Sequence, residues 1–446
     1  MDATLQLGRR VLGRAAGAFD DLEVYVERRT VTTLQAGTGG GLRDVGRSDI
    51  LGVGVRATIG ERVGYASTTD TTERGIDEVV DRAHANTTAS DVDPPGARLP
   101  PPGGADIRAD LCQAALTEMP LDAKVSLVTT LARRVTTLDP RVRRLDTAQW
   151  RDEHREVAVT STRGLVASYE SAFAELWCDA LGEDDHGAAS DYGCWWGRDP
   201  MTVDVERLAA DAVSRTVRLL GPITSVRESD PLVLDPAVSG LLLEAIGKAL
   251  TGGALGNRRS PFAGRLGERV AASFVQLSDD GTCAAAPRGA PIDDEGVPRQ
   301  HTPLIRGGVL VGALHSTATA ATFEGAVSTG NARRSSYKAL PRAAPTALRL
   351  APSAGGRPAP RNATYLQQVT GSGTGISSAT GRVSLGGVGY VVRGGEPARR
   401  FAPVPIATSL QTILHELVSI DDDAQVIPDL PVLAPTVEWR PTRPLT

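Results

Sequence analysis

The chain has 446 residues, of which 41% are hydrophobic and 23% charged, with 48 glycines and 29 prolines. This length is enough for two or three domains, and the balance is typical of a soluble globular protein rich in turns and strands. The net charge of −5, without a long basic run, argues against partners that attract by charge alone, so we expect no nucleic acid and no membrane.

The sequence predicts a cytoplasmic protein. Arginine and glycine interrupt residues 1–17, so this segment lacks the apolar core of a secretory signal, and no run approaches the roughly 20 apolar residues that span a bilayer. The four cysteines, Cys112, Cys178, Cys194 and Cys283, are far apart and fit no metal-ligand spacing. We expect them to stay reduced.

The first half of the chain shows both helical and strand periodicity. Apolar residues at helical spacing predict helices over 1–19, 73–86, 121–138 and 203–220. Alternating residues predict strands over 22–27, 31–37, 50–56, 62–67, 142–150, 153–161 and 165–177. The first two of these strands are expected to pair as a hairpin, and Arg163-Gly164 suits a tight turn between the last two. Residues 91–105, rich in proline and glycine, predict an irregular connection.

The second half is richer in glycine and β-branched residues. A short strand over 232–234, a helix over 239–250 and a closing helix over 409–418 are expected, with strands and loops between them. The sequence therefore predicts an α+β fold with an N-terminal α/β domain over 1–225, its strands mostly antiparallel, and a strand-rich C-terminal domain over 226–446.

No familiar catalytic motif is complete. The six histidines lie too far apart for one helix to supply two metal ligands, and LHELVS (414–419) has Ser419 where an HExxH helix needs its second histidine. No GxSxG motif marks a serine nucleophile. The glycine-rich residues 371–381 lack the Lys and Ser/Thr that end a phosphate-binding loop, which favours a loop of close backbone approach instead.

Two further groups of residues leave alternatives open. The acids Asp279-Asp280 and Asp293-Asp294-Glu295 could bind a hard cation, although exposed turns with solvated charge are favoured. Trp195 and Trp196 form the densest aromatic spot in a chain with 4% aromatic residues, so they predict either a partner or substrate surface or simple core packing.

From residue 232 onward the chain resembles the TldD/PmbA family of peptidases. LEAIGK (243–248), SPFAGRLG (260–267) and VQLSDDG (275–281) are similar to the family core, in which an HExxxH element precedes the same continuation. GVGVR (52–56) and GYAST (64–68) resemble its N-terminal strands. The glycines of 370–390 and PIATSL (405–410) resemble its C-terminal region. Each motif is short, but together they cover most of the chain in the family's order.

The departures from the family pattern concern the zinc site. The resemblance places Leu243 and Lys248 where catalytic members have histidines, with Glu244 between them as the retained carboxylate. Catalytic members also use a cysteine near the carboxyl end, and this chain has none after Cys283. Leucine offers no lone pair, and a lysine ammonium repels Zn²⁺. The degenerate positions Leu243, Glu244 and Lys248 are therefore assigned no catalytic role, and no cofactor-binding residue or metal ligand is predicted in this chain.

The pattern resembles the TldE (PmbA) branch of the family. This resemblance implies a non-catalytic subunit that pairs with a TldD-like, zinc-bearing HExxxH homologue and helps to enclose a site for peptide or amide substrates. It also implies that zinc is held by the partner, and that natural-product maturation is one conceivable role. Two alternatives remain: a stand-alone peptide- or protein-binding module, and an enzyme that uses Glu244 and Lys248 as an acid/base pair.

Overall fold

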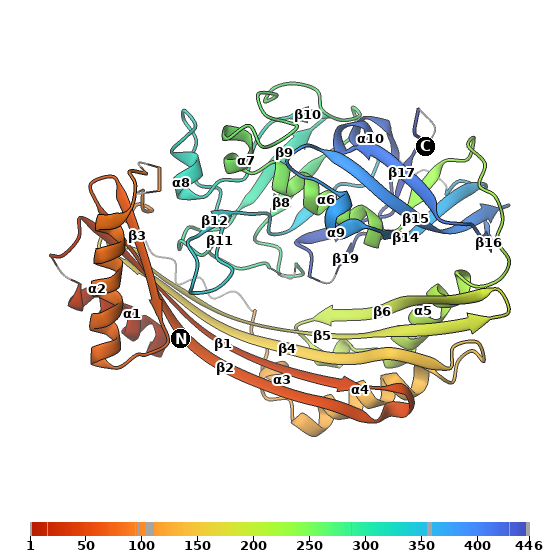
Figure 1. Ribbon diagram of the computed structural model, residues 1–446, viewed down its shortest axis with the longest axis horizontal. Coiled ribbons are helices and arrows are strands. Elements are labelled where there is room, and N and C mark those ends of the chain that lie inside the picture. The colour runs from red at the N-terminus through yellow and green to blue at the C-terminus, as the bar shows by residue number, and fades with distance from the viewer. Residues whose placement is uncertain are drawn as a thin grey trace.

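The computed structural model describes residues 2–15, 17–93, 95–96, 98–102, 111–286, 288–354, 359–427 and 429–442. The first half is built on a six-stranded antiparallel sheet with the order β3-β2-β1-β4-β5-β6. Its strands are β1 (Asp21–Ala36), β2 (Leu42–Ile59), β3 (Arg62–Thr68), β4 (Arg144–Ser161), β5 (Val166–Asp184) and β6 (Gly187–Gly197). Figure 1 shows the sheet as a long curved layer beneath the second half of the chain.

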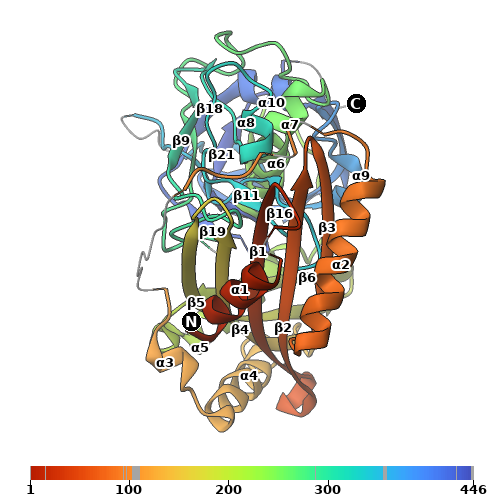
Figure 2. The same cartoon turned by 90° about the vertical axis from the view of Figure 1, so that its left-hand side faces the viewer.

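Helices cover the side of this sheet that faces away from the second half. They are α1 (Asp2–Arg14), α2 (Glu73–Ala89), α3 (Ala114–Thr117), α4 (Leu121–Val135) and α5 (Val205–Arg218), with short 3₁₀ turns η1 (Thr38–Gly40) and η2 (Pro200–Thr202). Helices α1 and α2 pack on one end of the sheet around Val24 and Val26, and α4 and α5 pack on the other end around Leu34 and Trp150. Figure 2 shows α1 and α2 side by side on the outer surface.

The sheet has longer strands than the sequence predicts. The expected hairpin of 22–27 with 31–37 is wrong, because β1 continues through both segments and pairs with β2 on one side and β4 on the other. Likewise 142–150 and 153–161 belong to the single strand β4, and β6 was not expected at all. Polar residues such as Arg28 and Arg29 suggest a turn, yet a central strand tolerates them where its faces are open to water.

The second half contains short strands around a buried helix. Its helices are α6 (Pro236–Ala249), α7 (Gly252–Gly256), α8 (Thr317–Ala320), α9 (Ser372–Gly375) and α10 (Leu410–Glu416). Its strands are β7 (Leu232–Leu234), β8 (Leu277–Asp280), β9 (His301–Arg306), β10 (Val309–Leu310), β11 (Ala332–Arg333), β12 (Arg342–Ala343), β13 (Leu348–Leu350), β14 (Ala363–Thr370), β15 (Arg382–Arg393), β16 (Glu396–Arg400), β17 (Val404–Ser409), β18 (Leu417–Ile420), β19 (Gln425–Val426), β20 (Val432–Ala434) and β21 (Val437–Trp439).

Two larger sheets organise these strands. One has the order β10-β9-β8-β13-β20-β19, and the other has β16-β15-β14-β7-β21-β18, with β17 paired to β15. Helix α6 contacts strands of both sheets and belongs to their shared hydrophobic core. The predicted α+β class is confirmed, whereas the predicted domain boundary near residue 225 stays a prediction. No helix in the described ranges has the length and apolar character needed to cross a membrane.

A buried ionic network joins the curved sheet to the second half. Arg56 donates from Nη2 to Glu23 Oε2 at 2.6 Å and from Nη1 to Glu295 Oε1 at 3.0 Å. Arg334 donates to the other carboxylate oxygen of Glu23. All four side chains are at most 3% exposed, with two of each sign. Burial of a single ion is costly, so this arrangement depends on each charge keeping its partner.

A second network lies beside the first on β1 and β4. Arg155 donates from Nε to Glu27 Oε1 at 2.6 Å, from Nη1 to the Tyr169 hydroxyl at 2.9 Å and from Nη2 to the Tyr25 hydroxyl at 2.5 Å. Its Nη2 also lies 3.3 Å from Asp294 Oδ1, across the junction. Glu23, Tyr25 and Glu27 therefore lie on the strand face that the second half covers, and the sequence-based expectation of a half-buried strand is wrong there.

The acids at 293–295 are fully buried, which corrects the expectation of exposed turns. Asp293 accepts backbone N–H groups of Glu295 at 2.9 Å, Val297 at 3.0 Å and Ala332 at 2.9 Å. Asp279 is likewise buried and accepts three N–H groups, from residues 331, 346 and 347. Carboxylates in this setting organise loops through backbone hydrogen bonds, and the neighbouring acids Asp294 and Glu295 carry the ionic contacts to the sheet.

We expect the substitution Glu23→Gln to lower the free energy of unfolding by about 3–5 kcal/mol, because it leaves two buried guanidinium groups short of one negative charge. The matched control is Asp49→Asn, which breaks the pair with Arg28, a pair whose side chains are 41% and 49% exposed. That change is expected to cost less than about 1 kcal/mol. Urea unfolding followed by circular dichroism measures both, and equal losses in the two variants would contradict the account.

Candidate functional site

Helix α6 carries the residues that the sequence comparison singled out. Asp235 caps its start by accepting the Ala237 N–H at 3.0 Å, and Pro236 occupies the first turn, where a missing N–H costs nothing. The helix is apolar on most of its circumference, which is why it lies inside the second half. Glu244 and Lys248 are the exceptions, with side chains 19% and 53% exposed.

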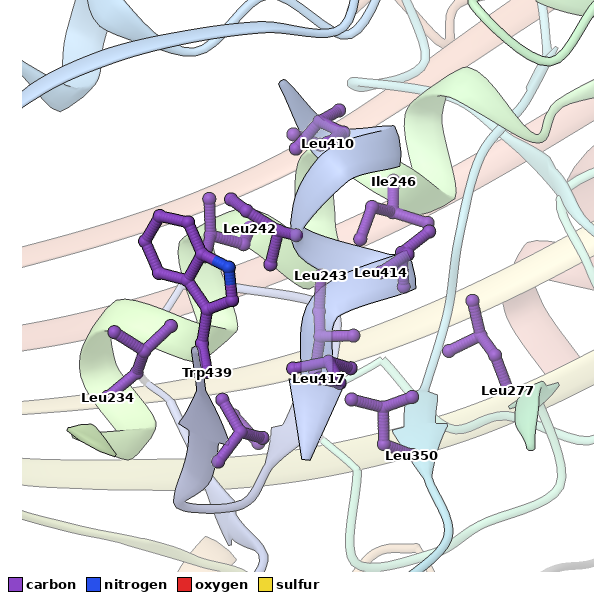
Figure 3. Close-up of a cluster of buried hydrophobic side chains, with 14 of the residues drawn as sticks. Leu234, Leu242, Leu243, Ile246, Leu277, Leu350, Leu410, Leu414, Leu417 and Trp439 are labelled. Carbon is purple, nitrogen blue, oxygen red and sulfur yellow. The ribbon is translucent and has the colours of Figure 1, made fainter. Parts of the chain in front are cut away.

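Leu243 is a core residue. It is 2% exposed and belongs to the cluster that α6 forms with α10 and the surrounding strands. Figure 3 shows it in this cluster together with Leu242, Ile246 and Leu414. A side chain without lone pairs at this position cannot bind a metal ion, and its packing shows what it does instead.

Glu244 and Lys248 form an ion pair along the helix. Lys248 Nζ lies 3.0 Å from Glu244 Oε2, in the i,i+4 arrangement. An ammonium group has three donors and no acceptor, so it is a partner for the carboxylate and not for a cation. The residues at these three positions do not fit the zinc ion of the HExxxH pattern. We therefore derive no chemical step through zinc in this chain.

The histidine of α10 does not complete a metal site. His415 lies at the exposed end of the helix, where burial and the nearby Arg265 and Arg269 lower its pKa. Its neighbour Glu416 accepts the Trp439 indole N–H at 3.0 Å and the Thr442 N–H at 3.1 Å.

A cavity of about 190 Å³ lies between the curved sheet and the second half. This is many times the ~10–15 Å³ that one water molecule needs. The cavity has an unusual concentration of charged side chains. Seven of its lining residues are arginines: Arg29, Arg151, Arg155 and Arg198 from the first half and Arg288, Arg299 and Arg333 from the second. Four are acids: Glu153, Glu175, Asp294 and Asp429.

Several of the arginines are satisfied within the protein. Arg29 and Arg151 each donate to Glu153 Oε2 at 2.5 Å. Arg155 belongs to the second network described above, and Arg299 donates to the Ile292 carbonyl at 2.9 Å and to Thr346 Oγ1 at 2.6 Å. Arg299 therefore makes its hydrogen bonds to neutral acceptors, while its charge acts on the buried carboxylates of Asp279, Asp293 and Asp294.

Aromatic rings form one wall of the cavity. Trp196 stacks on Phe173 with ring centroids 5.6 Å apart, and Arg198 lies 5.6 Å from the Trp196 ring centroid. Trp195 points to the opposite face of β6 and stacks on Trp150 in the core. Trp195 therefore has the core packing that one alternative predicts, and Trp196 lines the cavity, because successive strand residues face opposite sides. A partner or substrate surface at Trp196 stays a prediction.

The arginines of the second half lie close enough to one another to affect each other's protonation. Burial and the neighbouring Arg333 lower the pKa of the Arg288 guanidinium to about 10, while Glu244 and Asp429 act in the opposite direction. The sequence could have indicated the cavity wall on the sheet, since 151, 153 and 155 on β4 and 169, 171, 173 and 175 on β5 share one face. What it could not indicate is which surface covers them.

One group of three potential metal ligands occurs among the described residues, on the face of the sheet opposite the cavity. Ligand atoms of Cys112, His154 and Glu170 lie within 4.8 Å of one another. His154 Nε2 lies 2.6 Å from Glu170 Oε1, and burial and Glu170 raise the pKa of the Cys112 thiol to about 12. The thiol is therefore protonated at neutral pH and donates to the carboxylate, so the group forms a hydrogen-bonded chain.

Family comparisons match most of the chain. Residues 22–87 match the model of PmbA/TldA metallopeptidase domain 1, residues 115–220 its central domain, and residues 227–440 its C-terminal domain. Among curated proteins, the metalloprotease TldD homologue of Haemophilus influenzae is 27% identical over 304 residues, covering 65% of this chain and 62% of that protein. The metalloprotease PmbA homologue of the same organism is 24% identical over 381 residues, covering 84% and 81%.

The match to the Haemophilus TldD homologue thus spans about three fifths of that protein's length. Among solved structures, TldE from Thermococcus kodakarensis superimposes with a TM-score of 0.87 at 20% identity, covering 97% of this chain and 98% of that chain. At this level of identity the likeness establishes the fold alone.

We expect alanine substitutions at two positions of α6 to differ in how strongly they change the free energy of unfolding. Leu243→Ala should lower the free energy of unfolding by about 2–5 kcal/mol, because it leaves a cavity in the core. Lys248→Ala should change it by less than about 0.5 kcal/mol, because a half-exposed helix pair contributes little. Urea titrations with and without a zinc chelator measure both values, and a chelator-dependent stability that either substitution abolishes would contradict this description.

Proposed function

Because the chain belongs to the PmbA/TldD metallopeptidase family, we propose that it is a non-catalytic subunit of a heterodimeric, zinc-dependent peptidase. In this proposal the partner is a TldD-like homologue with an intact HExxxH element, and the partner holds the zinc. This chain contributes surface and binding groups for a peptide or amide substrate. A cytoplasmic location and a role in natural-product maturation remain proposals about its setting, made from the sequence alone.

The observation that carries the proposal is the chemistry of helix α6. Leu243 packs in the core and Lys248 pairs with Glu244 at 3.0 Å, so neither residue offers the imidazole nitrogens of a catalytic member. The general base of such a site needs a carboxylate free to accept a proton from a bound water. Here the carboxylate accepts from an ammonium instead, which favours a supporting role for this chain.

The cavity supports the substrate-binding part of the proposal. It combines arginines, carboxylates and the stacked rings of Phe173 and Trp196 at the junction of the two halves. Peptide sites combine apolar area with a few fixed polar groups in this way. The same observation favours a second candidate, a stand-alone peptide- or protein-binding module, because the cavity is formed by one chain.

The acid/base alternative is less well supported by the geometry. Lys248 is 53% exposed, and a lysine active as a base needs burial to lower its pKa toward neutrality. Among the described residues, no serine, threonine or cysteine side chain is hydrogen-bonded to the side chain of Glu244 or Lys248.

We expect peptidase activity on an unfolded substrate only when this chain is co-expressed with an HExxxH homologue from the same organism. Three samples are compared: this chain alone, the homologue alone, and the two together. The mixture should exceed the sum of the separate samples by at least about tenfold, because only the assembled pair has both a zinc site and a complete substrate site.

Two matched substitutions assign the chemistry. Glu244→Gln in this chain should leave the activity of the pair within about twofold, whereas Glu→Gln in the HExxxH element of the homologue should abolish it. Activity of this chain alone, lost in Glu244→Gln, would instead establish the acid/base alternative. Peptide binding by this chain without association with the homologue would favour the stand-alone module.

A further inference from the structure

Four of the cavity arginines have no carboxylate partner among the described residues. Arg198 and Arg299 each donate at least two hydrogen bonds to neutral acceptors, whereas Arg288 and Arg333 are less well satisfied. Arg288 donates from Nη2 to the backbone carbonyl of Asp429 at 2.8 Å, and no ion pair to its guanidinium occurs among the described residues. The side chain of Arg333, at the end of β11, has neither an ion pair nor a hydrogen bond within that part of the chain. Both are only partly exposed. They differ in this from Arg29, Arg151 and Arg155, whose charges are met by acids.

The electrostatic surroundings of this pair are unfavourable to positive charge. Burial lowers the pKa of Arg333, and Arg155 and Arg299 act in the same direction against the pull of Asp294. Arg288 is destabilised first by burial and then by Arg333 and Arg299. Partly buried guanidinium groups that repel one another gain from a nearby negative charge. The protein itself supplies too little of that charge at this wall.

The shape of the group that would fit follows from guanidinium chemistry. Arginine offers its N–H donors in a planar fork that matches the two oxygens of a carboxylate. Arg299 and Thr346 lie on the same wall, and Phe173 and Trp196 lie across from it. An acidic group on a short organic stem can therefore place its oxygens on the arginines and its carbon atoms on the rings.

The acids of the cavity favour a singly charged ligand. Four acids line the same space: Glu153, Glu175, Asp294 and Asp429. They would repel a phosphate with two negative charges about twice as strongly as a carboxylate with one. Burial raises the pKa of Glu175, with Arg151 opposing and Asp429 adding to the effect, which indicates that negative charge on that side is already costly.

We propose that Arg288 and Arg333 bind a carboxylate group of a peptide in this cavity, either its C-terminus or an Asp or Glu side chain. The inference rests on the proposed function in that it takes the ligand to be a peptide. It adds that this chain selects peptides by negative charge. Both arginines line the cavity from the second half of the chain, so the bound carboxylate lies on that wall.

The test measures peptide binding to this chain alone by fluorescence anisotropy, with a labelled six-residue peptide that ends in glutamate. Two further peptides carry glutamine in place of the glutamate or an amide in place of the C-terminal carboxylate. At least one of these replacements should weaken binding about tenfold or more, and which one does so identifies the source of the carboxylate.

Variants of the protein locate the site. Arg288→Met and Arg333→Met should each weaken binding of the acidic peptide by about tenfold, and Arg333→Lys should fall between them and the wild type, because lysine keeps the charge but not the fork. The control is Arg207→Met, an arginine with a side chain 81% exposed on helix α5, which should bind as the wild type does. Thermal unfolding confirms that each variant is folded.

The proposal is overturned if the wild type binds none of the peptides, if all three peptides bind equally, or if the cavity variants bind as Arg207→Met does. Inorganic phosphate that competes more strongly than acetate would also overturn it in favour of a phosphate site. The binding assay contains no HExxxH homologue, so it tests this inference separately from the proposed function. If the peptide binds through the two arginines but this chain forms no peptidase complex with the homologue, the inference stands and the proposed function is contradicted.

Discussion

The shared buried charges between the curved sheet and the second half are the constraint on which the structure depends. Arg56 and Arg334 of opposite halves both bind Glu23, and Glu295 returns a contact from the second half to Arg56. Each ion is buried, and Glu295 and Arg334 of the second half have their ionic partners Arg56 and Glu23 in the first half. The same contacts set the distance between the two walls of the cavity. The position of the cavity arginines is therefore a consequence of how the halves are joined.

The degenerate helix and the cavity have complementary roles in this arrangement. Leu243 is part of the hydrophobic core, and the Glu244–Lys248 pair occupies the helix face that remains polar. The charged and aromatic cavity between the halves is the feature suited to binding. In the proposed function the chemistry comes from a partner.

The sequence predicts the elements better than their surroundings. Apolar periodicity located α2, α4, α5 and α6, because each helix buries a stripe whose spacing is visible in the chain. The alternation of Glu23, Tyr25 and Glu27 predicted a strand but not its burial, since period two separates two faces without saying what covers either. The burial of the acids at 293–295 is missed for the same reason, because the first-half partners Arg155 of Asp294 and Arg56 of Glu295 lie 139 and 239 residues away in the chain. The cavity arginines depend on such contacts too, so they could not be found from one chain.

The central claim is that this chain supplies binding groups while a homologue supplies the zinc, and native mass spectrometry of the co-purified proteins tests it most directly. The account predicts a complex that contains both chains and zinc. The zinc should be lost when the HExxxH element of the homologue is mutated, and it should be retained when Glu244 of this chain is mutated. A His154→Ala variant removes the group of potential ligands that occurs among the described residues. Zinc retained by that variant in isolation, or the failure of the two chains to associate, would contradict the account.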